Sequence, residues 1–400
     1  MKKKTSLVIL CGGKGSRLGN ITKKTPKPLI EIGGKPFIEH LINFYQRYDF
    51  ENIFLVGFYK GNRFKKFFKN KVYNFIKTTF IIEDKPSDTA GALNTVRNKV
   101  SGDVVVINGD SYLDYDFDKF DKFHNSHRCH SMILLKNKNY KTNNKLNNLK
   151  IKNNFVNYNK KNDYMNGGIY YFNKNIFKNI PKNKKTSIEN ELLPPLIESK
   201  KIKGIISKGF FIDIGTKKNL DYAKKKLLKK IKKPAIFLDR DGVLNVDNGY
   251  NYNFSKMKWI NNTLTFLSKL KKDKIKFFIV TNQSGIGRGM YSEKIFLQLQ
   301  KKIKKFLLKK NIFIDDIKYC PHHPTFGVGK YKKSCSCRKP NNQMISDIIH
   351  GWSIDINKSI MIGDKETDFI AAKKSSIKFY YQNKENLNKI TRIFQKINFK

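Results

Sequence analysis

Two aspartates near the middle of the chain have a spacing that suits phosphate chemistry. Asp239 and Asp241 come directly after the apolar run 235–238 and are separated by a single arginine. Carboxylates this close together, at the end of an apolar run, suit a site that attacks phosphorus with one of them. The pair therefore predicts a phosphate-handling site with a carboxylate nucleophile.

A glycine-rich segment near the N-terminus predicts a second phosphate site. Gly12, Gly13 and Gly15 allow backbone N–H groups to approach a triphosphate closely, and Arg17 can neutralise its charge. Shortly afterwards Lys27 stands between two prolines, in a rigid segment. A plain tight turn would also explain the glycines, and a solvated surface position would also explain the lysine. The neighbouring motifs decide between these interpretations.

A cluster of cysteines and histidines predicts a metal centre. Cys320, His322, Cys335 and Cys337 provide three thiolates and one imidazole, a set that favours tetrahedral Zn²⁺. Four protein ligands leave no open position, so we expect a structural ion. His323 is the alternative nitrogen ligand, and reduced, metal-free cysteines are the alternative to a metal centre.

The pattern of elements in the first half predicts an α/β fold. Apolar runs indicate strands at 6–10, 52–57, 80–83 and 104–108, and a helix is expected over 37–48. Such alternation favours a mostly parallel sheet flanked by helices, with ligands at the carboxyl ends of the strands. The Lys- and Asn-rich stretch 136–162 is expected to hold a weak hairpin and a mobile loop.

A lysine-studded helix followed by a proline predicts a join between two domains. Apolar residues recur at helical spacing over 220–231, Pro234 follows, and alternation of strands and helices then restarts. Further strands are expected at 277–281 and 359–363. We therefore expect two α/β domains, residues 1–230 and 234–400, each built on a mostly parallel sheet with flanking helices.

Composition excludes some classes of protein and leaves one open. No apolar run approaches the roughly 20 residues that span a bilayer, and the lysines at residues 2–4 precede a run that is better explained as a first strand than as a signal peptide. We therefore expect a cytoplasmic protein without membrane association, and a homo-oligomer stays open. The net charge of +49 raises the alternative of a nucleic-acid-binding protein. Its lysines are scattered along both halves without a nucleic-acid-binding signature, which favours solvated surface positions.

The N-terminal motifs resemble those of sugar-1-phosphate nucleotidylyltransferases over residues 5–225. The signature is Gly12-Gly13-x-Gly15-Ser16-Arg17-Leu18 followed by Pro26-Lys27-Pro28, with Ser16 in place of the family's usual threonine. Four further motifs follow in the family's order: Thr89-Ala-Gly91 for the nucleotide base, Asp110 for metal, Asn166-Gly167-Gly168 for the sugar, and Asp213 for metal.

The resemblance implies attack of a sugar phosphate on the α-phosphate of a nucleoside triphosphate, with release of pyrophosphate. Mg²⁺ held by Asp110 and Asp213 would bridge the phosphates, and Arg17 and Lys27 would offset the remaining charge. The chain departs from the family at 160–161, where two lysines replace a Glu-Lys pair, and at 217–218. These departures leave the identity of the sugar open.

The C-terminal motifs resemble those of haloacid-dehalogenase-type phosphatases. In that family Asp239 would be the nucleophile and Asp241 the general acid and base. The residues implied to bind the phosphate are Thr281, Asn282 and Ser284. Lys339 would neutralise the aspartyl-phosphate, and Asp364, with Asp239 and Asp241, would hold Mg²⁺.

The cysteine-rich insert narrows this resemblance. A zinc loop that ends in Cys335-Ser-Cys337-Arg338-Lys339-Pro, with Thr-Asn-Gln-Ser-Gly earlier, resembles D-glycero-D-manno-heptose 1,7-bisphosphate 7-phosphatases over residues 234–385. The related histidinol-phosphate phosphatases share most of these motifs. Zinc would pin the loop so that Arg338 and Lys339 face the active site.

Together the two resemblances imply consecutive steps in the synthesis of a nucleotide-activated heptose. The C-terminal domain would remove the 7-phosphate, and the N-terminal domain would transfer a nucleotidyl group, with GTP as the expected donor and GDP-heptose for surface polysaccharide as the product. The main alternative is activation of another sugar, such as mannose or glucose 1-phosphate, beside a different small-molecule phosphatase.

Overall fold

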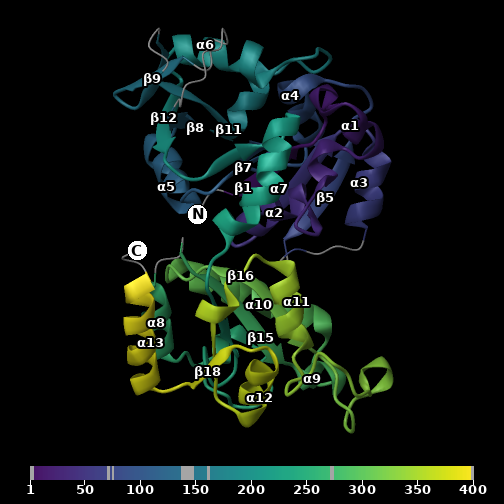
Figure 1. Ribbon diagram of the computed structural model, residues 1–400, viewed down its shortest axis with the longest axis vertical. Coiled ribbons are helices and arrows are strands. Elements are labelled where there is room, and N and C mark those ends of the chain that lie inside the picture. The colour runs from purple at the N-terminus through teal and green to yellow at the C-terminus, as the bar shows by residue number, and fades with distance from the viewer. Residues whose placement is uncertain are drawn as a thin grey trace. The chain divides into compact units, whose positions relative to one another are not determined.

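The computed structural model describes residues 4–69, 73, 76–136, 148–159, 163–270 and 274–397. The chain forms two compact units, the first from residues 1–42 and 50–230 and the second from residues 43–49 and 231–400. In Figure 1 the first unit runs from purple to teal and the second from green to yellow. The division near Ile231 falls at the end of helix α7 (Lys217–Ile231), next to Pro234.

The described part of the first unit contains a nine-stranded sheet in the order β5-β4-β1-β6-β11-β8-β12-β10-β9. Strands β5, β4, β1 and β6 are parallel, and Val8 of β1 lies between Phe54 of β4 and Val106 of β6. All three side chains are buried, as expected for a parallel sheet covered on both faces. The strands are β1 (Thr5–Leu10), β4 (Asn52–Gly57), β5 (Lys77–Ile82), β6 (Asp103–Asn108), β8 (His130–Lys136), β9 (Leu149–Lys152), β10 (Phe155–Tyr158), β11 (Tyr164–Phe172) and β12 (Ile202–Ser207).

The sheet changes character at β11, which runs antiparallel to both β6 and β8. The expected parallel arrangement therefore holds for the first four strands, and the far half is mixed. Strand β11 shifts register between Asn166 and Tyr170. Asn166 still pairs with Leu134, and the irregularity interrupts the pairing with β8 directly after it, at Gly167 and Gly168.

Helices complete the first unit. They are α1 (Asn20–Lys24), α2 (Phe37–Tyr45), α3 (Gly61–Phe68), α4 (Asp88–Gly91), α5 (Phe117–His127), α6 (Leu193–Glu198) and α7. Helix α2 ends three residues before the expected position, because Tyr48 N donates to Tyr45 O in a tight turn there. Asp116 caps α5 by accepting from Lys119 N at 3.2 Å.

A short ribbon brings together two segments that lie far apart in the sequence. Strand β7 (Ser111–Leu113) pairs antiparallel with β13 (Phe211–Asp213), so that Asp213 faces Ser111. Ile214 N also donates to Asp110 O at 2.9 Å. The ribbon therefore places Asp110 and Asp213 on neighbouring strands.

The second unit has a five-stranded sheet in its described residues, in the order β16-β15-β14-β17-β18, and every pair is parallel. Its strands are β14 (Ala235–Leu238), β15 (Lys276–Asn282), β16 (Ile314–Cys320), β17 (Ile360–Gly363) and β18 (Lys378–Tyr381). Because all strands run the same way, the residues that follow β14, β15 and β17 meet at one edge. This edge carries Asp239, Thr281 and Asp364.

Six helices flank this sheet among the described residues: α8 (Asn261–Lys269), α9 (Ser284–Gly287), α10 (Glu293–Lys309), α11 (Gln343–Gly351), α12 (Glu366–Lys374) and α13 (Lys384–Ile397). Helices α8 and α13 lie side by side (Figure 1). Helix α10 presents a buried stripe of Phe296, Leu299, Ile303 and Leu307, the spacing of an amphipathic helix.

Two expectations fall partly outside the described residues. Within 136–162 the expected hairpin is formed by β9 and β10, which pair antiparallel. Residues 137–147 and 160–162, including the lysines at 160–161, lie outside the part of the chain that the structure describes.

None of the helices in the described residues has the length and apolar character needed to cross a bilayer.

Candidate functional sites

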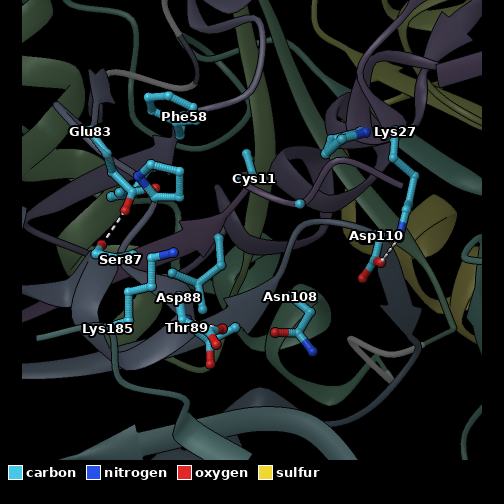
Figure 2. Close-up of a pocket in the computed structure, with 17 residues that line it drawn as sticks. Cys11, Lys27, Phe58, Glu83, Ser87, Asp88, Thr89, Asn108, Asp110 and Lys185 are labelled. Atoms are coloured by element: carbon cyan, nitrogen blue, oxygen red, sulfur yellow. Dashed lines mark hydrogen bonds and ion pairs between the residues drawn. The ribbon is translucent and has the colours of Figure 1, made fainter. Parts of the chain in front are cut away.

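A cavity of about 380 Å³ lies at the carboxyl ends of β1, β4, β5 and β6 in the first unit. Of the predicted site residues, five line it: Gly12, Gly13, Lys27, Thr89 and Asp110. Figure 2 shows Lys27 and Asp110 at one side of the cavity and Glu83 with Ser87 at the other.

The Lys27–Asp110 ion pair defines the first side of the cavity. Lys27 Nζ lies 2.7 Å from Asp110 Oδ2, and the lysine is buried. Asp110 Oδ1 accepts from Ser111 Oγ at 3.2 Å. The lysine therefore neutralises a carboxylate that the sequence analysis assigned to metal.

Arg17 and Asp213 extend this side beyond the cavity lining. Asp213 accepts from Gly215 N at 2.8 Å and from Asn219 Nδ2 at 2.9 Å. A Cβ added to Gly215 would lie 3.4 Å from Arg17 Nη2, so the guanidinium lies beside the Asp213 turn. Asp110, Asp213, Arg17 and Lys27 are thus brought into one neighbourhood.

The glycine loop needs glycine at Gly15. Its φ is +66°, and a Cβ there would lie 2.8 Å from Thr22 Cγ2. Ser16 then begins a short 3₁₀ turn, Ser16–Leu18. Within the described residues neither Gly15 nor Ser16 lines the cavity, so they shape the loop while Gly12 and Gly13 face the ligand space.

The base and sugar segments are linked by a carboxylate that the sequence analysis missed. Thr89 Oγ1 donates to Glu189 Oε2 at 2.9 Å, and Tyr170 OH donates to Glu189 Oε1 at 3.1 Å. Asn166 Nδ2 donates to Tyr170 OH at 2.7 Å. This chain of contacts orients Thr89 and Asn166 together, and no local sequence signal pointed to Glu189.

Glycines in the predicted base segment and in the predicted sugar segment allow close packing. A Cβ on Gly91 would lie 2.9 Å from Ser87 Cβ, and one on Gly167 would lie 2.9 Å from Ile133 O. Gly168 has a φ of +67°, and its Cβ would lie 2.8 Å from Asn108, which lines the cavity. The predicted sugar segment is therefore adjacent to the cavity without lining it.

Glu83 is a second residue that the sequence analysis overlooked, because it was counted only as the end of a strand. Its carboxylate accepts from Ser87 Oγ, and Oε2 would lie 3.0 Å from a Cβ on Gly12. Burial raises the pKa of Glu83, although hydrogen bonds from Ser87 oppose the shift. A buried carboxylate beside the phosphate loop is suited to accept hydrogen bonds from a ligand.

In the second unit, Lys339 organises the predicted nucleophile. Its Nζ lies 2.9 Å from Asp239 Oδ1 and 2.5 Å from Asp368 Oδ1, and it donates to Val280 O at 2.9 Å. Burial, together with Asp368 and Asp241, raises the pKa of Asp239 to about 7 against the opposing charge of Lys339. A buried carboxyl with so strongly perturbed a pKa, held by a lysine, is typical of a functional site.

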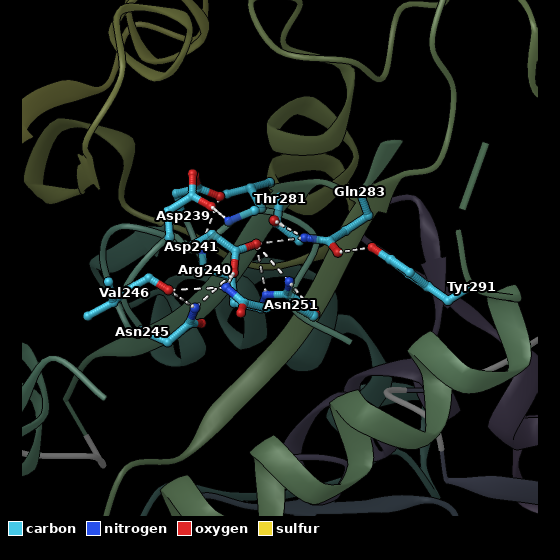
Figure 3. A network of polar contacts seen from close by, with 12 residues as sticks. Asp239, Arg240, Asp241, Asn245, Val246, Asn251, Thr281, Gln283 and Tyr291 are labelled. Carbon is cyan, nitrogen blue, oxygen red and sulfur yellow. Dashed lines mark hydrogen bonds and ion pairs between the residues drawn. The ribbon is translucent and has the colours of Figure 1, made fainter. Parts of the chain in front are cut away.

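Asp241 is held by an extensive set of donors (Figure 3). Its Oδ2 accepts from Arg240 Nε at 3.1 Å, Arg240 Nη2 at 2.7 Å and Gln283 Nε2 at 3.0 Å, and its Oδ1 accepts from Asn245 at 2.8 Å and Asn251 at 3.2 Å. Burial raises the pKa of Asp241, but the charge of Arg240 and these hydrogen bonds outweigh burial and hold the pKa below its ordinary value. The pKa values of the two neighbouring aspartates are therefore displaced in opposite directions, upward for Asp239 and downward for Asp241.

Three carboxylates form a group suited to a hard cation. Ligand oxygens of Asp239, Asp364 and Asp368 lie within 4.8 Å of one another. Asp364 Oδ1 is buried and has no hydrogen-bond partner among the described residues, and a Cβ on Gly242 would lie 2.2 Å from Asp364 Oδ2. This oxygen donor set fits Mg²⁺.

The predicted phosphate-binding residues have different surroundings. Thr281 Oγ1 accepts from Gln283 at 2.9 Å. Asn282 exchanges two hydrogen bonds of 3.0 Å with the Lys339 backbone, so it positions that lysine. Ser284 begins α9, a place where backbone N–H groups are available.

The cysteine-rich loop gathers the four predicted ligands. The Sγ atoms of Cys320, Cys335 and Cys337 lie 3.1–3.5 Å apart, and His322 Nδ1 lies 3.3 Å from Cys337 Sγ. All four ligand atoms lie within 4.8 Å of one another, and His323 is outside this group. Three sulfurs and one imidazole nitrogen fit Zn²⁺.

The same loop is connected to the predicted substrate residue. Arg338 Nη1 donates to His322 O at 3.2 Å. Because Lys339 follows directly, a change in the loop would displace both cationic side chains.

Comparison with known proteins assigns the class of each part. The family model for nucleotidyl transferases matches residues 6–230, more than half of the chain, and that for haloacid dehalogenase-like hydrolases matches residues 309–381. The chain belongs to the nucleotidyl transferase family.

Individual relatives specify the second part. D-glycero-beta-D-manno-heptose-1,7-bisphosphate 7-phosphatases from Photorhabdus laumondii and Haemophilus influenzae are each 44% identical over 144 residues, 36% of this chain and 77% and 78% of theirs. The chain also belongs to this phosphatase family, so it combines nucleotidyltransferase and phosphomonoesterase classes. HddC from Yersinia pseudotuberculosis, a solved structure, is 28% identical with a TM-score of 0.47, over 56% of this chain and 99% of its own.

Proposed function

We propose that this chain catalyses two consecutive steps of nucleotide-activated heptose synthesis, with residues 1–230 and 234–400 as the two catalytic domains. The second domain hydrolyses the 7-phosphate of D-glycero-D-manno-heptose 1,7-bisphosphate, and the first transfers a nucleotidyl group to the resulting 1-phosphate. The observation that carries the proposal is the presence in one chain of the Lys339-centred carboxylate group, close relatives that are heptose bisphosphate phosphatases, and the Lys27–Asp110 cavity.

In the phosphatase reaction, Asp239 attacks phosphorus and the bond to the sugar oxygen breaks. Asp241, ionised before substrate binds, must take up a proton in the substrate complex; it gives this proton to that oxygen, and it later takes a proton from the water that hydrolyses the aspartyl-phosphate. Lys339 offsets the negative charge, and Thr281 holds the phosphoryl group through its hydroxyl. Asn282 and Ser284 support this phosphate site, and Arg338 recognises the substrate.

Two metal sites belong to this proposal for the second domain. Asp239, Asp241 and Asp364 would hold Mg²⁺, and the ion would supply charge neutralisation for the phosphoryl group. Cys320, His322, Cys335 and Cys337 hold a structural Zn²⁺ that fixes the loop carrying Arg338 and Lys339.

In the nucleotidyl transfer reaction, the sugar phosphate oxygen attacks the α-phosphate and the bond to pyrophosphate breaks. Gly12, Gly13 and the loop shaped by Gly15 and Ser16 bind the phosphates. Arg17 and Lys27 neutralise charge at this site, and Asp110 with Asp213 would hold Mg²⁺, which would supply further charge neutralisation for the phosphates. Thr89 and Gly91 form the base side, and Asn166 and Gly167 form the sugar side.

The cavity supports GTP as the nucleotide. Guanine presents an N1–H and an exocyclic amine on one edge, and a carboxylate can accept from both. Glu83 offers such a carboxylate across the cavity from Lys27 (Figure 2). Glu83→Gln should then lower kcat/KM for GTP by about 10–100-fold, since a good bidentate contact contributes roughly 1–3 kcal/mol.

The test is a matched pair of assays on the intact chain. Phosphate release is measured from the 1,7-bisphosphate, and pyrophosphate release is measured from both anomers of heptose 1-phosphate with GTP, ATP, CTP and UTP in parallel. Turnover of the bisphosphate and of one anomer with GTP supports the proposal. Turnover only with mannose or glucose 1-phosphate, or phosphate release only from histidinol phosphate, would replace it with the alternative substrates.

The remaining attributes are extensions of the same proposal. Its substrates are soluble sugar phosphates and a nucleotide, which suits a cytoplasmic enzyme. We expect no nucleic-acid partner, because the lysines are scattered and no recognition motif accompanies them; their charge would attract phosphorylated small molecules.

A further inference from the structure

Gln283 occupies a position between two groups that the phosphatase reaction uses. Its Nε2 donates to Asp241 Oδ2 at 3.0 Å and to Thr281 Oγ1 at 2.9 Å. One amide nitrogen therefore contacts both the acid–base carboxylate and the phosphate-binding hydroxyl. Figure 3 shows the amide lying between these groups, with Tyr291 on its far side.

Tyr291 determines which end of the amide faces the active site. Its hydroxyl donates to Gln283 Oε1 at 2.9 Å. Asp241 accepts only, so it requires the amide nitrogen, and the carbonyl oxygen must then face the tyrosine. Burial raises the pKa of Tyr291 to about 12, so the phenol keeps the proton that it donates.

The surroundings prevent water from replacing these contacts. Gln283, Thr281 and Tyr291 are 3%, 1% and 5% exposed, respectively. The Gln283 backbone is also fixed, because its N–H donates to Cys320 O at 2.7 Å. A buried amide with both ends engaged has one stable orientation.

The contact with Thr281 has a chemical consequence. Because the threonine oxygen accepts the amide hydrogen, its own hydroxyl hydrogen points elsewhere and can be given to a phosphate oxygen. The contact with Asp241 holds Oδ2, together with Arg240, and so fixes the plane of the carboxylate. Both groups are thereby oriented before substrate binds.

We propose that Gln283, held by Tyr291, is a positioning residue for the phosphatase reaction, which orients Asp241 for proton transfer and Thr281 for the phosphoryl group. This inference rests on the proposed phosphatase activity. It adds two residues to that reaction, and neither touches the reacting phosphorus.

The experiment separates positioning from a general structural role by using two leaving groups. p-Nitrophenolate leaves without a proton, whereas a sugar alkoxide requires one. With p-nitrophenyl phosphate, Gln283→Leu should still form aspartyl-phosphate rapidly and then hydrolyse it slowly, which gives a burst of nitrophenolate. With the sugar phosphate, kcat should fall by about 100-fold without a burst, as expected when a reacting group is misplaced by about 1 Å.

Tyr291→Phe provides the second variant, in case Gln283→Leu fails to fold. It removes one hydroxyl from the end of the network, and we expect the same pattern with a loss of about tenfold on the sugar phosphate, near the cost of one hydrogen bond. Tyr319→Phe is the matched control, since its hydroxyl donates to Glu293 at 2.7 Å, away from Asp241. It should leave both substrates within about twofold of the parent.

Equal losses of the burst rate and of sugar phosphate turnover, or no loss in either variant, would overturn the inference. Failure of the proposed function would look different. If the parent protein hydrolyses another sugar phosphate but not the heptose bisphosphate, the proposed substrate is wrong. The variants are then compared on the sugar phosphate that the parent does hydrolyse.

Discussion

Replacing Asp239 by asparagine should abolish phosphatase activity and at the same time stabilise the second unit. Asp239 is 7% exposed, and its pKa of about 7 lies above the ordinary value of 3.8, chiefly because burial disfavours its charged form. At neutral pH the folded protein therefore bears the cost of an ionised, desolvated carboxylate. Asparagine keeps an oxygen that can accept from Lys339 and carries no charge.

The size of the effect follows from the pKa difference. The difference between a pKa of about 7 in the folded state and 3.8 in the unfolded state means that Asp239 destabilises the folded protein by about 4 kcal/mol near pH 8 and by about 2 kcal/mol near pH 5. A raised pKa means that the native state binds more protons than the unfolded state, so the penalty grows as pH rises. The stability advantage of Asp239→Asn should therefore be largest near pH 8 and should vanish below the unfolded pKa.

Tryptophan fluorescence isolates the relevant transition. The chain has two tryptophans, Trp259 and Trp352, and both belong to the second unit. Urea unfolding of parent and variant is compared at several pH values in magnesium-free buffer without a chelator, so that zinc is retained. Phosphate release should fall by at least about 10³-fold, as for loss of other nucleophiles, while pyrophosphate release stays unchanged as the internal control. A variant no more stable than the parent, or one whose advantage grows in acid, would refute the reasoning.

Three further outcomes are expected. Lys27→Ala should lower pyrophosphate release by about 10²–10³-fold, the usual cost of one charge-stabilising contact, with phosphate release intact; undiminished pyrophosphate release would remove Lys27 from the site. Cys335→Ser should lower bound zinc, measured by metal analysis, together with phosphatase activity, and a parent without zinc would contradict the metal centre. Burial lowers the pKa of His130 to about 4 from 6.5. As the pH falls, the unfolded state therefore takes up a proton before the folded state does, and the free energy of unfolding of the first unit should fall by about 3 kcal/mol between pH 6.5 and 4. His130→Gln should remove this part of the pH dependence of stability, measured by calorimetry. An unchanged slope of stability against pH would contradict the assignment to His130.

The sequence by itself determined most of the elements, and it predicted which residues react. Short apolar runs that end in Gly109-Asp110 or in Asp239 specify buried strands with polar residues at their carboxyl ends, because burial of the run and solvation of the carboxylate are local requirements. The linker before Pro234 and the spacing of the cysteines from Cys320 to Cys337 can likewise be recognised from residues that are close together in the sequence. Pattern and spacing were therefore enough to predict two α/β units with phosphate sites, and the resemblance to known families supplied the two reactions.

Only the tertiary structure decided which distant residues meet. Pairing of β7 with β13 brings Asp213 beside Asp110 across about a hundred residues of sequence, and the direction of β11 turns a parallel sheet into a mixed one. Glu189 and Glu83 carry no local signal, because their importance comes from the side chains and backbone folded against them.

The same distinction applies to Asp239, Asp241 and Gln283. The sequence supplied two aspartates of the same type, and their pKa values diverge only because folding desolvates Asp239 and surrounds Asp241 with donors from Arg240, Asn245, Asn251 and Gln283. Burial and hydrogen bonding are properties of the assembled core. The sequence thus determined which chemical groups are present, and the fold determined which of them hold a proton, which accept one, and what keeps them in place.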